Sequence, residues 1–181
     1  LSCGLVTMDA NAVGRMSCNP AIGGVAKGQL VRDIDALGGL MGVLSDEAGI
    51  QFRVLNQSKG PAVWGPRAQE DMDLYAERAQ HYLKQRNNLN IISGELDSFE
   101  KQAETYHLKL NTGVTLTSQA LIITSGTFLG AVMHTGLNSE EGGRFGEPSA
   151  LKLSHCIHKL GLKTRRLKTG TPARLKESSL D

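Results

Sequence analysis

Residues 105–127, TYHLKLNTGVTLTSQALIITSGT, contain the pattern that decides the fold class. Two short segments with alternating apolar residues flank Asn111-Thr112-Gly113, as the strands of a β-hairpin flank their turn. The segment 120–126 is then a continuous apolar run, which is typical of a strand buried on both faces of a parallel sheet. The pattern therefore predicts a buried sheet that is interrupted by a small antiparallel hairpin.

Three segments before the hairpin have the composition of strands. They are 1–8, 49–56 and 89–96, and the second shows the apolar and polar alternation of a half-buried strand. The glycine- and proline-containing segment 57–66 is predicted as the loop that follows it.

Three further segments have apolar residues at the spacing of amphipathic helices: 27–39, 66–88 and 148–161. Glycines end the first and third, and Pro66 suits the first position of the second. The residues predicted to face inward are Leu30, Val31, Ile34 and Leu37 in the first helix, Ala68, Met72, Tyr75, Ala79 and Tyr82 in the second, and Ala150, Leu153, Ile157 and Leu160 in the third.

This alternation predicts an α/β fold, an incomplete dinucleotide-binding, Rossmann-like FAD domain with a small antiparallel β excursion. The glycine fingerprint GxGxxG is absent from the 181 residues, so we expect it upstream of Leu1 and interpret 1–181 as one partial FAD-binding domain. Gly126 ends the last strand, where ligands of open α/β sheets bind. It is a cofactor candidate, and a tight turn is the alternative.

The composition is that of an ordinary globular protein, with 40% hydrophobic residues and a formal net charge of +2. No apolar run approaches the ~18 residues that a membrane-spanning helix needs, so no membrane association is expected. Cys3, Cys18 and Cys156 form no CxxC pair, which favours a reducing compartment and hence the cytoplasm.

Residues 16–24, MSCNPAIGG, place a cysteine, a turn and two glycines directly before a helix. The positive end of that helix would lower the pKa of the Cys18 thiol and favour the nucleophilic thiolate. The backbone N–H groups of Gly23 and Gly24 could lie against a flavin or a phosphate. The alternatives are a small buried cysteine and simple turn glycines.

Charged and aromatic side chains give weaker signals. Lys27 and Lys59 stand beside glycines and could pair with an anionic flavin or a phosphate, although solvated lysines are commoner. Trp64 could stack on a base or could simply pack. His155 and His158 have a spacing that could hold a metal, yet no third ligand is evident, so no metal site is predicted.

Six blocks carry a specific resemblance: GRMSCNPAIGGVAKGQLVRDIDALGG, GIQFRVLNQSKGPAV, RAQEDMDLY, LIITSGTFLGAVMHTG, GGRFGEPSA and RRLKTGTPARL. In this order they resemble the MnmG (GidA) family of tRNA uridine 5-carboxymethylaminomethyl modification enzymes. The resemblance implies a flavoprotein that uses FAD, NADH and methylene-tetrahydrofolate to modify carbon 5 of the wobble uridine of tRNA. It also implies the GTPase partner MnmE, a homodimer, and an internal fragment of a longer chain.

The resemblance also assigns roles to single residues. It makes Cys18 a catalytic candidate. Lys27, singled out above by its place beside a glycine, is the second catalytic candidate. Ala150 departs from the family, which often has a FAD-contacting serine there, so Ser149 is the candidate at that contact. The predicted cofactor-binding residues are Asn19, Pro20, Gly23, Gly24, Leu96 through its backbone, Gly126, Thr127 and Ser149.

The segment 163–176 gathers six Lys and Arg residues without an acidic one, which makes it the candidate tRNA-facing surface. The predicted nucleic-acid contacts are Arg165, Arg166, Lys168 and Arg174. Two other functions stay open from sequence. One is the related folate- and FAD-dependent tRNA uridine methyltransferase class, and the other is a non-catalytic RNA-binding scaffold with the same fold.

Overall fold

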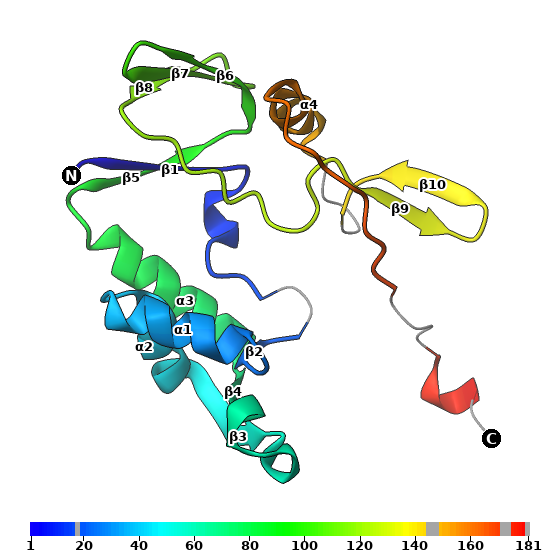
Figure 1. Cartoon of the computed structure of the whole chain (residues 1–181). Helices are drawn as coiled ribbons and strands as arrows, with labels where there is room; N and C mark the ends of the chain where they lie inside the picture. Colours follow the sequence, from blue (N-terminus) through cyan, green and yellow to red (C-terminus); the bar gives the residue numbers. More distant parts are fainter. Residues whose placement is uncertain (17–18, 144–148, 171–174, 180–181) are drawn as a thin grey trace. The chain divides into compact units, whose positions relative to one another are not determined.

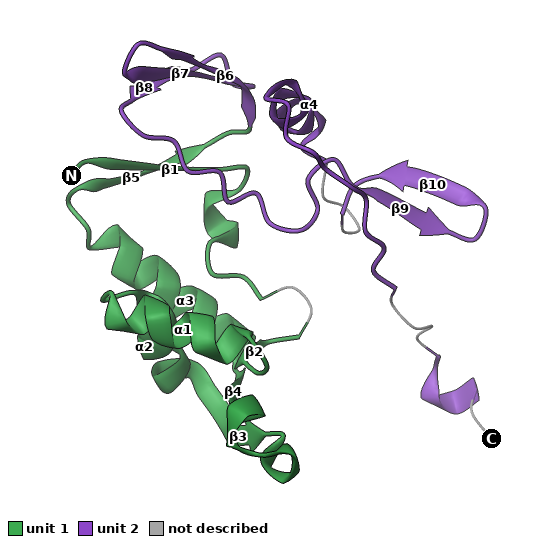
Figure 2. Ribbon diagram, in the orientation of Figure 1, with its two compact units in different colours: residues 1–95 green, residues 96–181 purple. Residues whose placement is uncertain are grey.

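The computed structural model describes residues 1–16, 19–143, 149–170 and 175–179. It divides the chain into two compact units, Leu1–Glu95 and Leu96–Asp181, which Figure 2 distinguishes by colour. Each unit is described by itself below. Two predicted site residues, Cys18 and Arg174, lie outside the described residues.

The first unit contains a pair of parallel strands, β1 (Cys3–Thr7) and β5 (Leu89–Ser93), as predicted. The register runs from Cys3 opposite Leu89 to Thr7 opposite Ser93. The backbone N–H of Gly94 continues the pairing by donating to the carbonyl of Thr7 at 2.8 Å. A short 3₁₀ turn, η1 (Ala10–Ala12), follows β1.

The first unit contains the helices α1 (Lys27–Ala36), α2 (Leu40–Ala48) and α3 (Met72–Lys84), and α2 and α3 supply most of its core. Figure 1 shows them lying beside one another. The buried cluster consists of Ile22, Leu44, Ala48, Tyr75 and Ala79. The sequence interpretation missed α2, because Gly38-Gly39 was taken as the end of helical structure and the nine-residue helix after it is too short to show a clear period.

A three-stranded antiparallel sheet completes the first unit. Its strands are β2 (Ala21–Gly23), β4 (Gly65–Glu70) and β3 (Gly49–Leu55), with β4 in the centre. Two 3₁₀ turns, η2 (Gln57–Lys59) and η3 (Pro61–Val63), connect β3 to β4.

The prediction that a helix begins at Pro66 was wrong. Residues 65–70 form strand β4, which pairs with β2 on one side and β3 on the other, and α3 begins only at Met72. The Asp71 carboxylate caps that helix by accepting from the N–H groups of Asp73 and Leu74, both at 3.0 Å. Long-range strand pairing therefore overrides the helical spacing of Ala68 with the residues that follow it.

Burial also differs from the expectation on α1 and β3. Of the predicted inward face of α1, Val31 packs against the core, whereas Leu37 is 89% exposed. On β3, Phe52 is 60% exposed, so the predicted half-buried strand is mostly exposed. These side chains extend beyond the small core of the unit, which is built around α2 and α3.

The second unit begins with the predicted hairpin. Strands β6 (Leu96–Gln102), β7 (Thr105–Leu110) and β8 (Thr115–Ser118) form an antiparallel sheet in that order. Gly113, with φ +84°, makes the turn between β7 and β8, a conformation that glycine adopts without strain. The predicted hairpin is thus confirmed, and β6 adds a third strand.

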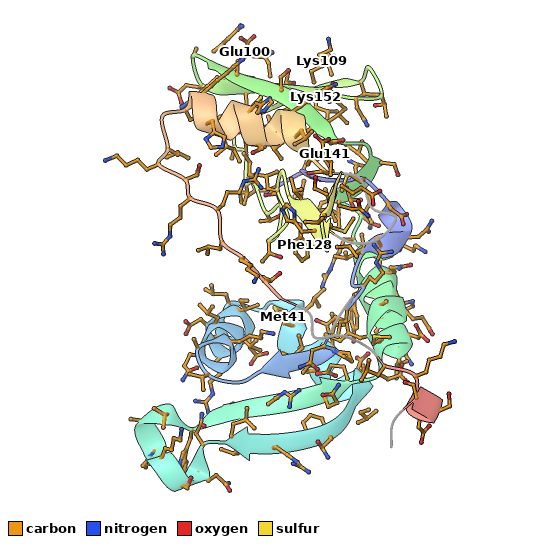
Figure 3. The ribbon with its side chains drawn as sticks, turned by 90° about the vertical axis from the view of Figure 1, so that its right-hand side faces the viewer. Met41, Glu100, Lys109, Phe128, Glu141 and Lys152 are labelled. Carbon is orange, nitrogen blue, oxygen red and sulfur yellow. The ribbon has the colours of Figure 1, made fainter. Side chains whose placement is uncertain are left out.

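Helix α4 (Leu151–Lys159) packs against β6. The Lys152 ammonium lies 2.7 Å from the carboxylate of Asp97 on that strand, and Leu153 is buried. Figure 3 labels Lys152 on this helix and Glu100 and Lys109 on the sheet. An unpredicted hairpin, β9 (Val132–Thr135) with β10 (Asn138–Glu141), and a 3₁₀ turn, η4 (Glu177–Ser179), complete the unit.

The apolar segment 120–126 is not a strand in the described chain, contrary to the expectation. Ile122 is 83% exposed. A β-strand is held in place by hydrogen bonds to a neighbouring strand. Among the described residues, the segment 120–126 pairs with no strand. The α/β class is nevertheless confirmed, since a parallel strand pair, helices and antiparallel sheets occur together. The division into one partial FAD domain stays a prediction.

Candidate functional site

The segment that follows Cys18 is held firmly to strand β4. The carbonyl of Pro20 accepts the backbone N–H of Glu70 at 2.7 Å and the side-chain amide of Gln69 at 2.9 Å. The Asn19 side-chain oxygen accepts from the Arg67 guanidinium at 3.4 Å. Asn19 and Pro20 therefore have ordered positions beside a polar part of the sheet, as a binding loop requires.

Gly23 and Gly24 have positive φ angles, +94° and +99°. A Cβ on Gly23 would lie 2.1 Å from the carbonyl oxygen of Pro66, and the N–H of Gly24 donates to that same oxygen at 2.7 Å. The close approach of β4 thus explains the glycine at 23, which belongs to strand β2 and not to a simple turn. A cofactor contact by either glycine stays a prediction.

Lys27 is the first residue of α1 and is exposed. Its ammonium donates to the carbonyl of Ala21 at 3.4 Å, a long hydrogen bond that joins the start of α1 to the start of β2. Ala26, at the N-cap, has φ +64° and offers no side-chain cap. A cation therefore stands at the start of the helix, and its catalytic role stays a prediction.

Sequence reasoning missed a buried carboxylate next to this loop. Glu70 is only 2% exposed, and both of its carboxylate oxygens lack a hydrogen bond of standard geometry among the described residues. Burial raises the pKa of the Glu70 carboxyl group, the Ser45 hydroxyl opposes this shift, and the Asp46 carboxylate adds to it. Burial and then the charge of Glu70 also raise the pKa of Tyr75.

No local signal identified Glu70, because the sequence interpretation placed it on a helix. An alternating strand pattern over 65–70 would have put Ala68 and Glu70 on one face and Arg67 and Gln69 on the other. Burial makes the Glu70 carboxyl group hold its proton more strongly than an exposed carboxyl group does, and such raised pKa values also occur in general acids and bases.

The other predicted cofactor residues belong to the second unit. Leu96 begins β6 opposite Leu110, and Gly126 has φ +74° with no atom within 4 Å of a Cβ built there. Thr127 is exposed. The Ser149 hydroxyl is buried without a hydrogen-bond partner among the described residues. That these residues share one site with the loop of the first unit stays a prediction.

The basic segment is irregular and exposed from 162 to 170. Arg166 differs from its neighbours, because its guanidinium donates to the carbonyl of Gly130 and ties the segment to the rest of the unit. Arg165 and Lys168 are exposed. A nucleic-acid contact by these residues stays a prediction, and Arg166 also has a structural role.

Two findings concern ligands and membranes. Within the described residues, no group of three or more His, Cys, Asp or Glu side chains could hold a metal ion. His158 instead lies within hydrogen-bond distance of Thr164, at 3.2 Å. Across the same part of the chain, no helix combines the length and the hydropathy needed to cross a bilayer.

Comparison with known families and curated proteins gives consistent matches. A family model described as "Glucose inhibited division protein A" matches residues 1–181. The "tRNA uridine 5-carboxymethylaminomethyl modification enzyme MnmG" of Bacteroides fragilis is 46% identical over 172 residues, and that of Porphyromonas gingivalis is 44% identical over 178 residues. These matches cover 94% and 98% of this chain but only 28% of each relative.

Solved structures agree with this. GidA of Aquifex aeolicus matches in two crystal forms at 42% identity, with TM-scores of 0.83 and 0.85. The matches cover 94% and 98% of this chain and 28% and 30% of the structures. The GidA-related protein of Thermus thermophilus, at 17% identity and a TM-score of 0.53 over 88% of this chain and 58% of that one, shows a shared fold alone. The chain thus spans less than a third of the length of the curated relatives it matches.

Proposed function

Because this chain belongs to the Glucose inhibited division protein A family, we propose that it is part of a flavoprotein enzyme that modifies carbon 5 of the wobble uridine of tRNA. The observation that carries the proposal is the 44–46% identity to proteins named as tRNA uridine 5-carboxymethylaminomethyl modification enzymes, over 94% or more of this chain. In this proposal, residues 1–181 are part of the FAD-binding domain.

The residues of the second unit fit a flavin nucleotide. The buried Ser149 hydroxyl has no partner among the described residues, so it is available for a hydrogen bond. Gly126 leaves open space where another residue would have a side chain, so a ligand can approach its backbone. When bound, FAD supplies hydride transfer, with NADH as the hydride source and methylene-tetrahydrofolate as the one-carbon donor.

The loop of the first unit supplies groups for binding and proton transfer. Asn19 and Pro20 are ordered by β4, so they can position a ring that lies against them. Lys27 would place a positive charge near an anionic ligand. Cys18, which precedes this ordered segment, would act as the nucleophile at carbon 6 of the uracil or as a proton carrier.

The proposal includes the partners that the family implies. The substrate is tRNA, the GTPase partner is MnmE, and the full-length protein is a homodimer in the cytoplasm. The exposed basic residues Arg165 and Lys168 support tRNA as a partner, because counterion release from phosphates favours such clusters.

The test uses the full-length protein that carries this chain, expressed in a bacterial strain that lacks its own MnmG. Nucleosides from total tRNA are analysed by mass spectrometry, and we expect 5-carboxymethylaminomethyluridine to return. The purified protein should show a flavin absorbance spectrum. Appearance of 5-methyluridine alone would favour the methyltransferase class. Binding of tRNA without any modified nucleoside or flavin would favour the scaffold, and either result would refute the proposal.

A further inference from the structure

The loop that joins β3 to β4 holds the single tryptophan of the sequence, Trp64, in an exposed but fixed position. The residue is 46% exposed. Its indole N–H donates to the carbonyl of Gln57 at 3.2 Å, and its backbone N–H donates to the carbonyl of Pro61 at 3.3 Å. The indole ring is therefore oriented by hydrogen bonds while much of it stays open to solvent.

The loop does not depend on the indole ring for its order. The Asn56 side-chain amide donates to the carbonyl of Val63 at 3.3 Å, and the backbone N–H of Lys59 donates to the carbonyl of Asn56 at 2.9 Å. Among the described residues, Trp64 belongs neither to the buried cluster of the first unit nor to the side chains packed against it. A tryptophan can bury about 150–250 Å² on contact, so an oriented ring at the surface is well suited to a partner.

The hairpin that carries Trp64 is positively charged. Residues 49–69 contain Arg53, Lys59 and Arg67 but no Asp or Glu, in a chain with 18 acidic residues. Arg67 forms hydrogen bonds to two neutral side chains. Arg53 and Lys59 are exposed, and neither has an ion pair within the part of the chain that the structure describes. The charge of this hairpin therefore complements that of a polyanion.

A hollow beside the indole offers space for a nucleotide. Gln57 belongs to both, because it lines the hollow and its backbone carbonyl accepts the indole N–H. Gly65, the residue after Trp64, is the register partner of Leu55, so the indole and the hollow lie at the same end of the hairpin. Figure 1 shows this end of β3 and β4 extending away from helices α1, α2 and α3. The full lining of the hollow is Arg53, Val54, Leu55, Asn56, Gln57 and Ser58.

We infer that Trp64 is a base-stacking residue on an RNA-binding surface formed by residues 53–64. Proteins hold single-stranded nucleic acids with exposed aromatic rings set among cations, since every base has a face that can stack on such a ring. Unpaired bases of RNA loops can be turned out for this stacking. Arg53 and Lys59 attract whichever backbone phosphates lie near them, so they need not meet at one group. The inference rests on the proposed function for RNA as the partner, and it assigns that partner a contact in the first unit.

The test measures binding of two labelled oligonucleotides to the full-length protein by fluorescence anisotropy at low salt. One is a decamer of uridylates, and the other is an abasic decamer with the same backbone and charge. Trp64→Ala is compared with Trp64→Phe, because both variants lose the hydrogen bond to Gln57 but only Trp64→Ala loses the aromatic ring. Lys59→Gln removes a charge and leaves the ring in place. Bound flavin and the melting temperature are recorded for every variant.

We expect Trp64→Ala to weaken binding of the uridylate decamer at least fivefold, whereas Trp64→Phe stays within about threefold of the unmodified protein. Neither variant should change binding of the abasic decamer. Lys59→Gln should weaken binding of both decamers and reduce the slope of log affinity against log salt by roughly 0.7, the loss of one phosphate contact to a single strand. The uridylate decamer should also quench the tryptophan emission that Trp64→Phe removes.

Equal binding of the uridylate decamer by the unmodified protein and by Trp64→Ala would overturn the inference, and so would loss of flavin in both Trp64 variants. If Trp64→Ala fails to fold, Trp64 emission that the decamer does not quench would overturn it instead. Restored tRNA modification together with either result would leave the proposed function intact. Stacking at Trp64 without any modified uridine would refute the proposed function alone.

Discussion

The backbone N–H of Glu70 donates to the carbonyl of Pro20 at 2.7 Å, so the strand that carries a buried carboxylate is joined directly to the loop that follows Cys18. A change at Glu70 can therefore affect the loop that contains Asn19 and Pro20 without a contact between Glu70 and any ligand. The same strand holds Arg67, which donates to Asn19 in that loop.

The first prediction concerns the charge of Glu70. Its pKa is raised in the folded protein, mainly by burial, so the ionised form opposes folding. The protonated Glu70 carboxyl group contributes its full stability at pH values below its pKa in the unfolded protein. This contribution is lost as the pH rises through its pKa in the folded protein. Glu70→Gln should therefore raise the melting temperature at pH 7, by on the order of 2 °C. The gain should shrink as the pH falls toward 4.5. A gain of equal size at both pH values would contradict this explanation.

The second prediction concerns Gly23. Gly23→Ala should destabilise the protein by about 3 kcal/mol or more, because it combines positive-φ strain with a clash. The clash arises because the new Cβ would lie 2.1 Å from the Pro66 oxygen. Gly38→Ala is the matched control, since its φ of +79° is similar but no atom lies within 4 Å of the Cβ position. It should cost only about 1 kcal/mol. Thermal melting of the two variants distinguishes the cost of the clash from the cost of the backbone strain. Equal losses of stability would show that the close approach of β4 does not determine the need for glycine at position 23.

The third prediction concerns the start of α3. The Asp71 carboxylate accepts two backbone N–H groups at 3.0 Å, so Asp71→Ala should cost about 1 kcal/mol of stability. Asp71→Asn keeps an acceptor at the same place and should cost clearly less. If the two variants melted at the same temperature, the boundary between β4 and α3 would not depend on this cap.

The fourth prediction concerns Cys18. In the full-length enzyme, Cys18→Ser should leave folding and bound FAD intact while the content of modified wobble uridine falls at least tenfold, since a serine hydroxyl is a far weaker nucleophile at neutral pH. Cys156→Ser is the control, because the Cys156 thiol is partly buried and donates to the carbonyl of Asp97 at 3.5 Å. Normal modification, or an unfolded Cys18→Ser protein, would favour the structural interpretation of this cysteine.

The fifth prediction concerns the basic segment. Replacing Arg165 and Lys168 by Ala should weaken tRNA binding and reduce the slope of log affinity against log salt by roughly 1.5, the loss of about two phosphate contacts. Both side chains are exposed, so folding should not change. Arg166 is left in place because it bonds to the carbonyl of Gly130. An unchanged slope would show that these residues form a solvated surface that does not contact tRNA.

Local patterns in the sequence determined several elements of this protein. The strands at 3–7 and 89–93, the hairpin around Gly113 and the glycine-terminated helices α1 and α4 depend on short-range periodicity and turn chemistry, which are visible in a few consecutive residues. The six quoted blocks were sufficient to indicate the family.

Tertiary structure alone decided the rest, because pairing and burial depend on residues far apart in the chain. Pro66 to Glu70 became a strand when β2 and β3 bonded to both of its edges, although its spacing favoured a helix. The same pairing buried the Glu70 carboxylate and placed Arg53 opposite Arg67 across 14 positions of sequence. The apolar segment 120–126 shows the converse, since an apolar run does not form a strand until another strand supplies its hydrogen bonds.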